Sequence, residues 1–305
     1  AFKYVKPNGR VLAVGDPYQS IYGFAGADIE SYNYIQEKLK AARLPLSGCF
    51  RCPENVITLA QKFRSDITAF TKKDGLIHDI KFNEVISMAK PGNLVICRIK
   101  APLQVLMFQM IDQGIAVEVH EDEVKEFIND LKFIFLPDEL NDQDVLRKQD
   151  DFFDEVMDRN LESINKRSNK LKDKESKEEF IREEGRLLNS KLEFIKKQLI
   201  LQVGCRNISE LLAKIEKLIS GGENAVKLST IHRAKGLEND SVFILDYNKL
   251  PFYRDGQKDW ELKQERNLKY VALTRTRKNL YLVNSDDVLD VEEDGSLFDE
   301  MEDMW

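Results

Sequence analysis

Short apolar runs alternate with amphipathic patterns along much of the chain, and this alternation predicts strands and helices in turn. Continuous apolar runs are typical of strands buried on both faces of a parallel sheet. They occur at Gly9–Gly15, Asn93–Arg98, Ile115–Val119, Val226–Leu228, Val242–Leu245 and Asn279–Asn284. Apolar residues recur at helical spacing in Ile29–Ala42, Glu54–Phe70, Ala101–Gln113 and Trp260–Arg275. This order predicts an α/β fold with a parallel sheet flanked by helices, with Thr71–Gly92 as a connecting region.

The pattern changes between His120 and about Ile219, where the sequence carries no strand signals. The segment Leu140–Lys197 is dense in charged residues, with apolar residues at helical spacing. We therefore expect a charged helical insertion between two strands of one sheet. Solvated helix faces account for its charges, and a coiled-coil seam is disfavoured because the heptads are not sustained.

The composition is that of a soluble globular protein, since 42% of the 305 residues are hydrophobic and 32% are charged. No apolar run approaches the roughly 20 residues of a membrane span, and Ala1–Arg10 lacks a signal-peptide pattern. The CxxC pair Cys49 and Cys52 has no second pair at metal-ligand spacing. We expect reduced thiols in a cytoplasmic location, no membrane contact and no metal site built by this chain.

The net charge of −7 does not by itself indicate a nucleic-acid-binding protein. The tail Asp286–Asp303 is strongly acidic, however, and can lie far from any binding site. A local basic groove can bind phosphates on an acidic protein, because charge effects are short-ranged at physiological salt. Nucleic acid is therefore not excluded as a partner.

One polar loop stands between two of the apolar runs, in Val226–Asp246. It carries Thr230, His232 and Arg233, followed by Gly236 and Glu238. The carboxyl ends of parallel strands are where an open α/β sheet binds ligands. A functional loop is therefore one interpretation, and a solvated connection is the other, since loops are polar in any case.

A second candidate segment, Asp16–Asp28, follows the first apolar run with the sequence DPYQSIYGFAGAD. The neutral amide of Gln19 can hydrogen-bond a phosphate or an attacking water without adding charge. Tyr22 and Phe24 are interleaved with small residues. Exposed aromatic rings of this kind stack on nucleobases, at about 1–3 kcal/mol per base, although insertion into the core is the alternative.

Two further candidates combine arginine with an element boundary. Phe50 and Arg51 precede a helix, and a ring beside a guanidinium can hold a base and reach a phosphate. Arg275 and Arg277 stand between a helix and a strand. An arginine aimed at a transferring phosphoryl group accelerates the reaction by about 10³–10⁵, but arginine at a helix C-terminus is also common because of the helix dipole.

The order of these segments is more specific than any one of them. QSIYGFAGAD, FRCPENV, LSTIHRAKGLE and ERNLKYVALTRTR follow one another along the chain. This series resembles the carboxyl-terminal motifs of superfamily 1 DNA helicases of the UvrD/Rep type, and covers Gly9–Asn284 apart from the insertion. The resemblance implies RecA-like motor domains: residues 1–42 as the end of the first, 43–119 and 223–285 as the second, 120–222 as a reduced accessory insertion, and 286–305 as an acidic tail.

The resemblance further implies ATP with Mg²⁺, single-stranded DNA and single-strand/duplex junctions as ligands, and movement in the 3′–5′ direction. On the nucleotide side it implies a γ-phosphate sensor in Gln19, γ-phosphate contacts from Arg51 and Arg275, and adenine stacking by Phe50, where the family usually has Tyr. Gly236 would permit close backbone approach and Glu238 would lie beside the nucleotide. Tyr22, Phe24, Thr230, His232 and Arg233 would contact DNA; Phe24 stands where Trp is frequent.

Two departures from the family limit what is carried over. No GxxxxGK[ST] phosphate loop and no acidic Mg²⁺-binding strand motif occurs in this sequence. We expect these parts, with the first motor domain, to precede Ala1, so that this fragment does not hydrolyse ATP alone. The insertion is also shorter than the family's large accessory domain. The alternative is a non-catalytic module that keeps the helicase fold to bind nucleic acid or a protein.

Overall fold

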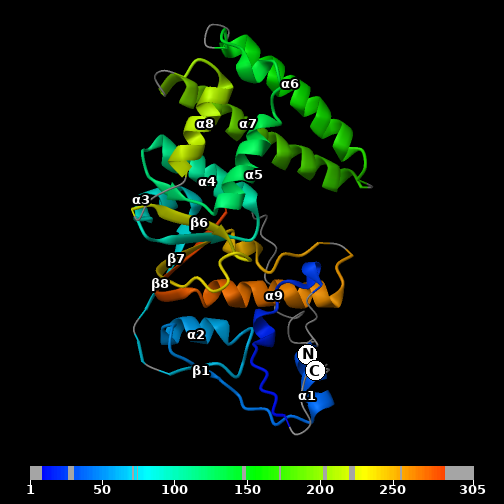
Figure 1. Cartoon of the computed structure of the whole chain (residues 1–305), viewed down its shortest axis with the longest axis vertical. Coiled ribbons are helices and arrows are strands. Elements are labelled where there is room, and N and C mark those ends of the chain that lie inside the picture. Colours follow the sequence, from blue (N-terminus) through cyan, green and yellow to red (C-terminus); the bar gives the residue numbers. More distant parts are fainter. Residues whose placement is uncertain are drawn as a thin grey trace.

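A computed structural model describes residues 9–26, 31–70, 72–73, 75–145, 149–171, 173–201, 205–219, 224–254 and 256–285. Its centre is a six-stranded sheet, ordered β3-β8-β7-β4-β6-β5, in which every pair of neighbours is parallel (Figure 1). The strands are β3 (Leu76–Lys81), β4 (Leu94–Cys97), β5 (Val117–Glu118), β6 (Val226–Thr230), β7 (Asn239–Leu245) and β8 (Thr276–Asn284). The predicted α/β fold with a parallel sheet is confirmed.

The two faces of the sheet are buried under different helices, as the alternation of side chains along a strand requires. In β4, Leu94 and Ile96 join a core with α2 (Glu54–Ala60) and α9 (Asp259–Leu273). Val95 and Cys97 point the other way, into a core with α3 (Val85–Met88) and α4 (Lys100–Asp112). Figure 1 shows α2 and α9 on one side of the sheet and α4 on the other. All four β4 side chains are buried, which explains the unbroken apolar run.

The helical insertion is built from α5 (Glu121–Lys132), α6 (Gln149–Ser168), α7 (Lys174–Leu201) and α8 (Ile208–Ile219). No strand occurs in the described part of 120–222, as the sequence predicted. Its buried apolar side chains belong to the same cluster as α4 and the sheet. Phe108 of α4, for example, stacks on Phe194 of α7 with ring centroids 4.3 Å apart. The insertion therefore extends the core of the sheet domain and has no separate core of its own among the described residues.

Three sequence predictions are corrected. Residues 9–15 form no strand, and Leu12 and Val14 are 85% and 78% exposed, because no described strand lies beside them to pair with. The predicted helix at 54–70 ends at Ala60, and the chain then turns into β2 (Thr68–Ala69), which pairs in parallel with β1 (Gly48–Cys49). Gln61 favours this turn, since its side-chain amide donates to the Ile67 carbonyl at 2.9 Å.

The third correction is β3, which lies within the predicted connecting region. It is an edge strand whose only buried side chain is Ile80, so it lacks the apolar run that marks a central strand. Elsewhere the predicted helices at 29–42 and 101–113 correspond to α1 (Ser31–Leu39) and α4. Among the described helices, none is both long and apolar enough to cross a membrane.

Candidate functional site

A pocket of about 540 Å³ opens where the β1 segment meets the junction of α9 and β8. Its wall comes from parts of the chain that are far apart in sequence. It is lined by Asp16, Gln19, Leu46, Ser47, Gly48, Cys49, Phe50, Arg51, Arg64, Ile67, Lys73, Glu238, Tyr270, Thr274 and Arg277. Four of the predicted site residues, Gln19, Phe50, Arg51 and Glu238, are therefore brought together here.

Arg51 is held at the pocket wall by two partners from the carboxyl-terminal half. Its Nε donates to Glu238 Oε2 at 2.5 Å, and its Nη1 donates to the Thr274 carbonyl at 3.1 Å. Arg277 approaches the other oxygen of Glu238 at 3.6 Å. The Arg51 guanidinium lowers the pKa of the Glu238 carboxyl, chiefly by hydrogen bonding. Glu238 is therefore an anion set between two guanidinium groups.

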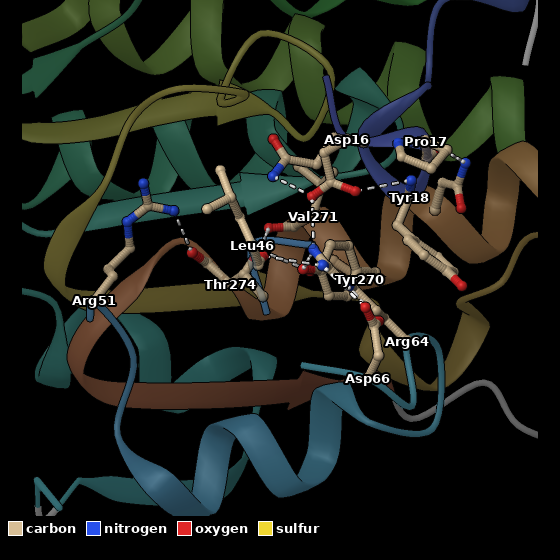
Figure 2. A network of polar contacts seen from close by, with 12 residues as sticks. Asp16, Pro17, Tyr18, Leu46, Arg51, Arg64, Asp66, Tyr270, Val271 and Thr274 are labelled. Carbon is tan, nitrogen blue, oxygen red and sulfur yellow. Dashed lines mark hydrogen bonds and ion pairs between the residues drawn. The ribbon is translucent and has the colours of Figure 1, made fainter. Parts of the chain in front are cut away.

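Asp16 lies in a network of polar contacts with Tyr18 and Arg64 (Figure 2), and it also positions Gln19. The Gln19 side-chain amide donates to Asp16 Oδ2 at 2.9 Å, and Arg64 Nη1 reaches the same oxygen at 3.1 Å. Asp16 Oδ1 accepts from the Tyr18 backbone N–H at 3.0 Å, which caps the short 3-10 helix Pro17–Gln19. Asn267 of α9 donates to the Pro17 and Ser20 carbonyls at 3.1 and 3.0 Å. These bonds fix the segment against α9.

Arg275 lies behind the pocket rather than in its lining. Its side chain is 1% exposed. The Nε donates to the Val271 carbonyl at 2.9 Å, Nη1 to the Leu237 carbonyl at 3.3 Å, and Nη2 to Thr274 Oγ1 at 3.2 Å. Burial, followed by repulsion from Arg51, lowers the pKa of this guanidinium to about 10. Arg275 thus connects the end of α9 to the backbone beside Glu238.

Phe50 lines the pocket and is paired with a second ring. It is 60% exposed and packs on Phe70, which is 63% exposed, with ring centroids 3.8 Å apart. The two rings are tilted by 31°, and their open surface can pack against another ring. The sequence indicated Phe50 for this position but gave no reason to select Phe70.

Several residues predicted to contact DNA lie at the start of the loop between β6 and β7 or in contact with it. Tyr22 is 37% exposed and its hydroxyl donates to the His232 carbonyl at 2.8 Å. The Lys235 ammonium lies 5.3 Å from the centre of the Tyr22 ring and donates to the Gln19 carbonyl at 2.7 Å. Burial, followed by the nearby Arg98 charge, lowers the pKa of His232 to about 4. The side chain of Phe24 lies outside the described residues.

Of the predicted DNA contacts, Thr230 is buried, and Arg233 is exposed but paired with groups of the helical insertion. Thr230 is buried, and its Oγ1 accepts from the Arg233 backbone N–H at 3.4 Å. Arg233 points to the start of α5, where it lies 3.2 Å from Glu123 Oε1 and 2.8 Å from His120 Nδ1. Desolvation raises the pKa of Glu123. Arg233 is therefore engaged by the helical insertion in this structure.

The loop between β6 and β7 connects the pocket with the residues predicted to contact DNA. Gly236 has φ of +97°, in the left-handed region that favours glycine. No atom lies within 4 Å of the position that a side chain there would occupy, so the backbone is open to a ligand. Before this glycine, His232 and Lys235 contact the Tyr22 segment; after it, Glu238 lines the pocket.

No group of three or more potential metal ligands occurs in the described part of the chain. The pocket offers Asp16 and Glu238 as carboxylates, but both are engaged by arginine side chains. The chemistry it can perform is therefore recognition of an anion beside a ring. Arg51, Arg277 and Lys73 provide the charge, and Phe50 provides the ring.

Comparison with known proteins decides the family. The model for the UvrD-like helicase C-terminal domain matches residues 29–287, and that for the UvrD/REP helicase N-terminal domain matches residues 2–40. The chain belongs to the UvrD-like helicase C-terminal domain family. The fold and the resemblance predicted from the sequence are thereby confirmed.

Several curated helicases are similar to this member of the UvrD-like family over part of their length. The ATP-dependent DNA helicase PcrA of Bacillus subtilis is 41% identical over 81 residues, 26% of this chain and 11% of PcrA. The ATP-dependent DNA helicase Rep of Buchnera aphidicola is 37% identical over 86 residues, 28% of this chain and 12% of Rep. UvrD1 of Mycobacterium tuberculosis is 38% identical over 74 residues, 24% of this chain and 10% of UvrD1. The matched segments thus span about a tenth of each relative.

Sequence reasoning missed several residues of this UvrD-like site. Asp16 and Arg64 hold Gln19, Lys235 holds the Gln19 carbonyl, and Phe70 supports Phe50. Asp16 carried a usable signal, because an aspartate directly before Pro17 is a common cap of a short helix. Arg64 carried none, since its partner lies 48 residues away.

Proposed function

We propose that this chain supplies the carboxyl-terminal motor part of an ATP-dependent helicase that moves along single-stranded DNA and unwinds duplex, in the 3′–5′ direction. Residues 1–42 would end the first RecA-like motor domain, and 43–119 with 223–285 would form the second. Residues 120–222 would be a reduced accessory insertion and 286–305 an acidic tail, in a cytoplasmic protein. The observation that carries the proposal is the loop His232–Glu238, which touches both candidate ligand sites.

The pocket offers groups that would contact the adenine and the γ-phosphate of ATP. Phe50, supported by Phe70, would stack on the adenine, and Arg51 would turn from Glu238 to the γ-phosphate. Gln19 would sense the same phosphate, oriented by Asp16 and Arg64. Arg275 would act on the γ-phosphate only after leaving the backbone carbonyls that it now contacts. Gly236 would allow the backbone to approach the nucleotide, and the Mg²⁺ ligands would come from the first motor domain.

Single-stranded DNA would lie on the opposite side of the loop. Tyr22 and Phe24 would stack on bases, and His232, which is neutral at pH 7 because of its low pKa, would donate a hydrogen bond without adding charge. Thr230 and Arg233 would also contact the DNA, at its phosphate backbone and at a single-strand/duplex junction. Arg233 would then exchange the α5 carboxylate for a DNA phosphate.

The exposed segment 9–15 supports a missing first motor domain as the partner. Leu12 and Val14 are largely exposed although their sequence is that of a buried strand. Pairing of this segment in the sheet of a first motor domain would bury both. Such a domain would also bring the phosphate loop, so this chain alone should bind nucleotide weakly and should not hydrolyse it.

The test compares ATP turnover of this chain alone with that of a protein joining it to a first motor domain that carries a phosphate loop. We expect turnover only in the joined protein, stimulated by single-stranded DNA, together with unwinding of a duplex that has a 3′ single-stranded tail. Turnover that is absent with and without DNA would contradict the motor proposal. Equal unwinding of 5′-tailed duplex would contradict the direction alone.

The enclosed position of Arg275 favours one alternative function, a non-catalytic module that keeps the helicase fold to bind nucleic acid or a protein. In that case Arg275 would serve only to join α9 to the loop beside Glu238. The same comparison separates the two functions. The module would bind DNA or a protein and show no ATP turnover in the joined protein.

A further inference from the structure

Arg277 lines the pocket but has no part in the contacts with ATP proposed above. Its side chain is 47% exposed and lies between two carboxylates. Nε is 2.9 Å from Asp240 Oδ1, and Nη1 is 3.6 Å from Glu238 Oε1. The first distance is that of a close ion pair, whereas the second exceeds ordinary hydrogen-bond length. Arg277 is therefore bound to Asp240 and stands close to Glu238 without being bound to it.

The register of two neighbouring strands places Arg277 between these carboxylates. β7 and β8 run parallel, and Asn239 is paired with Thr276. Glu238 and Asp240 flank Asn239 in the chain, and both reach Arg277, the residue after Thr276. The Asn239 backbone N–H also donates to the Arg275 carbonyl at 3.0 Å, which fixes the start of β7 against β8. The sheet thus keeps Arg277 within reach of both carboxylates.

Five side chains of alternating charge form a row along this edge of the pocket: Arg51, Glu238, Arg277, Asp240 and Lys278. Arg51 Nε lies 2.5 Å from Glu238 Oε2 at one end of the row. At the other end Lys278 Nζ lies 2.6 Å from Asp240 Oδ2, the oxygen that Arg277 does not hold. The row contains three cations and two carboxylates. One cation can therefore leave it without leaving a carboxylate unpaired, provided that the others shift along.

Arg51 is the cation that the proposed function withdraws from this row. If Arg51 turned to the γ-phosphate and nothing else moved, the Glu238 carboxylate would lose its closest partner. An unpaired carboxylate beside an entering polyphosphate repels it, since like charges interact over several ångströms in a partly solvated site. A movement of less than about 1 Å brings Arg277 Nη1 to bonding distance from Glu238. Lys278 meanwhile stays with Asp240.

We propose that Arg277 is a positioning residue of the nucleotide site, which takes over Glu238 when Arg51 turns to the γ-phosphate. The inference rests on the proposed function and adds a residue to it. Arg277 acts through Glu238 and does not touch the nucleotide. Its effect is confined to nucleotides that carry a γ-phosphate, because only these draw Arg51 away. Arg277 therefore favours binding of ATP over binding of ADP.

The change of partner is tested first on the 305-residue chain without nucleotide. Arg51→Gln imitates the departure of Arg51, and the pKa of Glu238 is measured from the pH dependence of its side-chain carboxyl ¹³C shift. Arg277→Gln should raise this pKa more in the Arg51→Gln background than in the wild type, because Arg277 has then closed on the carboxylate and favours its charged form. An equal or smaller rise in that background would overturn the proposal.

The effect on nucleotide is measured in the protein joined to a first motor domain, with ADP and a non-hydrolysable ATP analogue as ligands. Arg277→Gln should weaken binding of the analogue by about fivefold, the size of a partly exposed charge pair, and leave binding of ADP unchanged. Arg277→Lys keeps the charge and should restore most of the affinity. Arg254→Gln is the matched control, since Arg254 is exposed and pairs with Glu261 outside the pocket. An equal loss for ADP and the analogue would overturn the proposal.

Glu238→Gln separates an action through Glu238 from a direct contact with phosphate. Without a carboxylate at this position no new partner is needed, so adding Arg277→Gln to Glu238→Gln should cause no further loss of analogue binding. A further loss of the full size would show that Arg277 contacts the phosphate itself, and would overturn the proposal. Failure of both nucleotides to bind the joined protein would contradict the proposed function and the nucleotide effect with it, whereas the change of partner measured on this chain would stand.

Discussion

Arg51 and Glu238 are 187 residues apart in sequence, yet Arg51 Nε donates to Glu238 Oε2 at 2.5 Å. The pair closes one side of the pocket, since both residues line it. Glu238 also ends the loop that begins at His232 beside Tyr22. A ligand that takes Arg51 from Glu238 therefore removes one contact at the end of a loop whose start contacts Tyr22, while Arg277 stays near Glu238 and Arg275 stays bonded to the Leu237 carbonyl.

The first prediction concerns this pair. Glu238→Ala in the protein joined to a first motor domain should reduce the stimulation of ATP turnover by single-stranded DNA, by about tenfold, because the loop loses its link to Arg51. The measurement is the ratio of turnover with and without DNA. Asp240→Asn is the control, since Asp240 pairs with Arg277 and Lys278 but does not line the pocket. An unchanged ratio in Glu238→Ala would refute the coupling.

The second prediction separates the two roles of Arg275. Arg275→Ala should abolish ATP turnover and largely spare DNA binding. It should also lower the free energy of unfolding of this chain by about 3 kcal/mol, because two buried acceptors and one part-buried acceptor lose their donor. Arg277→Ala, whose side chain is 47% exposed, should change that free energy by less than about 0.5 kcal/mol. Urea denaturation measures both variants. Retained turnover in a folded Arg275→Ala protein would count against the γ-phosphate role.

The third prediction is the pH dependence that His232 contributes. Its pKa is lowered from 6.5 to about 4 in the folded chain, so the unfolded state binds more protons between these values. The stability due to the neutral imidazole is full above pH 6.5 and is lost as the pH falls toward 4. Urea denaturation from pH 4 to 7 should show a smaller decline for His232→Gln than for the wild type. Parallel curves would show that His232 is not held neutral.

The fourth prediction concerns the contact between Arg233 and α5. Glu123→Gln should tighten binding of single-stranded DNA, by a few-fold, because it weakens the group that competes with phosphate for Arg233. Arg233→Ala should weaken binding and reduce the slope of log K against log salt by about 0.7. Fluorescence anisotropy of a labelled oligonucleotide over a salt series measures both. Glu121→Gln is the matched control, since Glu121 pairs with Lys125. Equal affinities of Glu123→Gln and this control would argue against competition.

The fifth prediction uses Trp260 as a reporter. Trp260 is 41% exposed and lies against Gly23, since a side-chain carbon built on Gly23 would stand 3.0 Å from its ring. It is therefore beside Tyr22 and the proposed DNA path. In a Trp305→Phe chain, Trp260 is the one remaining tryptophan of the sequence. Its fluorescence should be quenched by a single-stranded oligonucleotide, and a signal that is constant at saturating DNA would place the strand elsewhere.

The sequence predicted the strands that are buried on both faces, because their apolar residues form short runs. β4 and β7 are interior strands marked by consecutive apolar residues, and the interior strand β6 was marked by Val226 and Leu228. β3 was missed because an edge strand buries one face at most, here through Ile80 alone. The segment 9–15 has the pattern of a strand but no described neighbour, since a pattern cannot say which sheet receives it.

The candidate site was predictable only as far as its residues lie in motifs. Gln19, Arg51 and Glu238 were selected from separate stretches and do line one pocket. Arg64 was not selected, because its pairing with Asp16 depends on the turn that ends α2 at Ala60. The burial of Thr230 and the pairing of Arg233 with α5 could not be predicted either, since the pairing depends on how the insertion packs.

The shared core of the sheet and the insertion has a mechanical consequence. Because Phe108 of α4 and Phe194 of α7 belong to one buried cluster, the insertion cannot swivel without breaking the core of the sheet domain. Any rotation of the sheet is carried outward by α7, whose 28 residues span about 42 Å. A small rotation of the sheet domain would therefore displace the far end of the α6–α7 hairpin over a longer distance than its base.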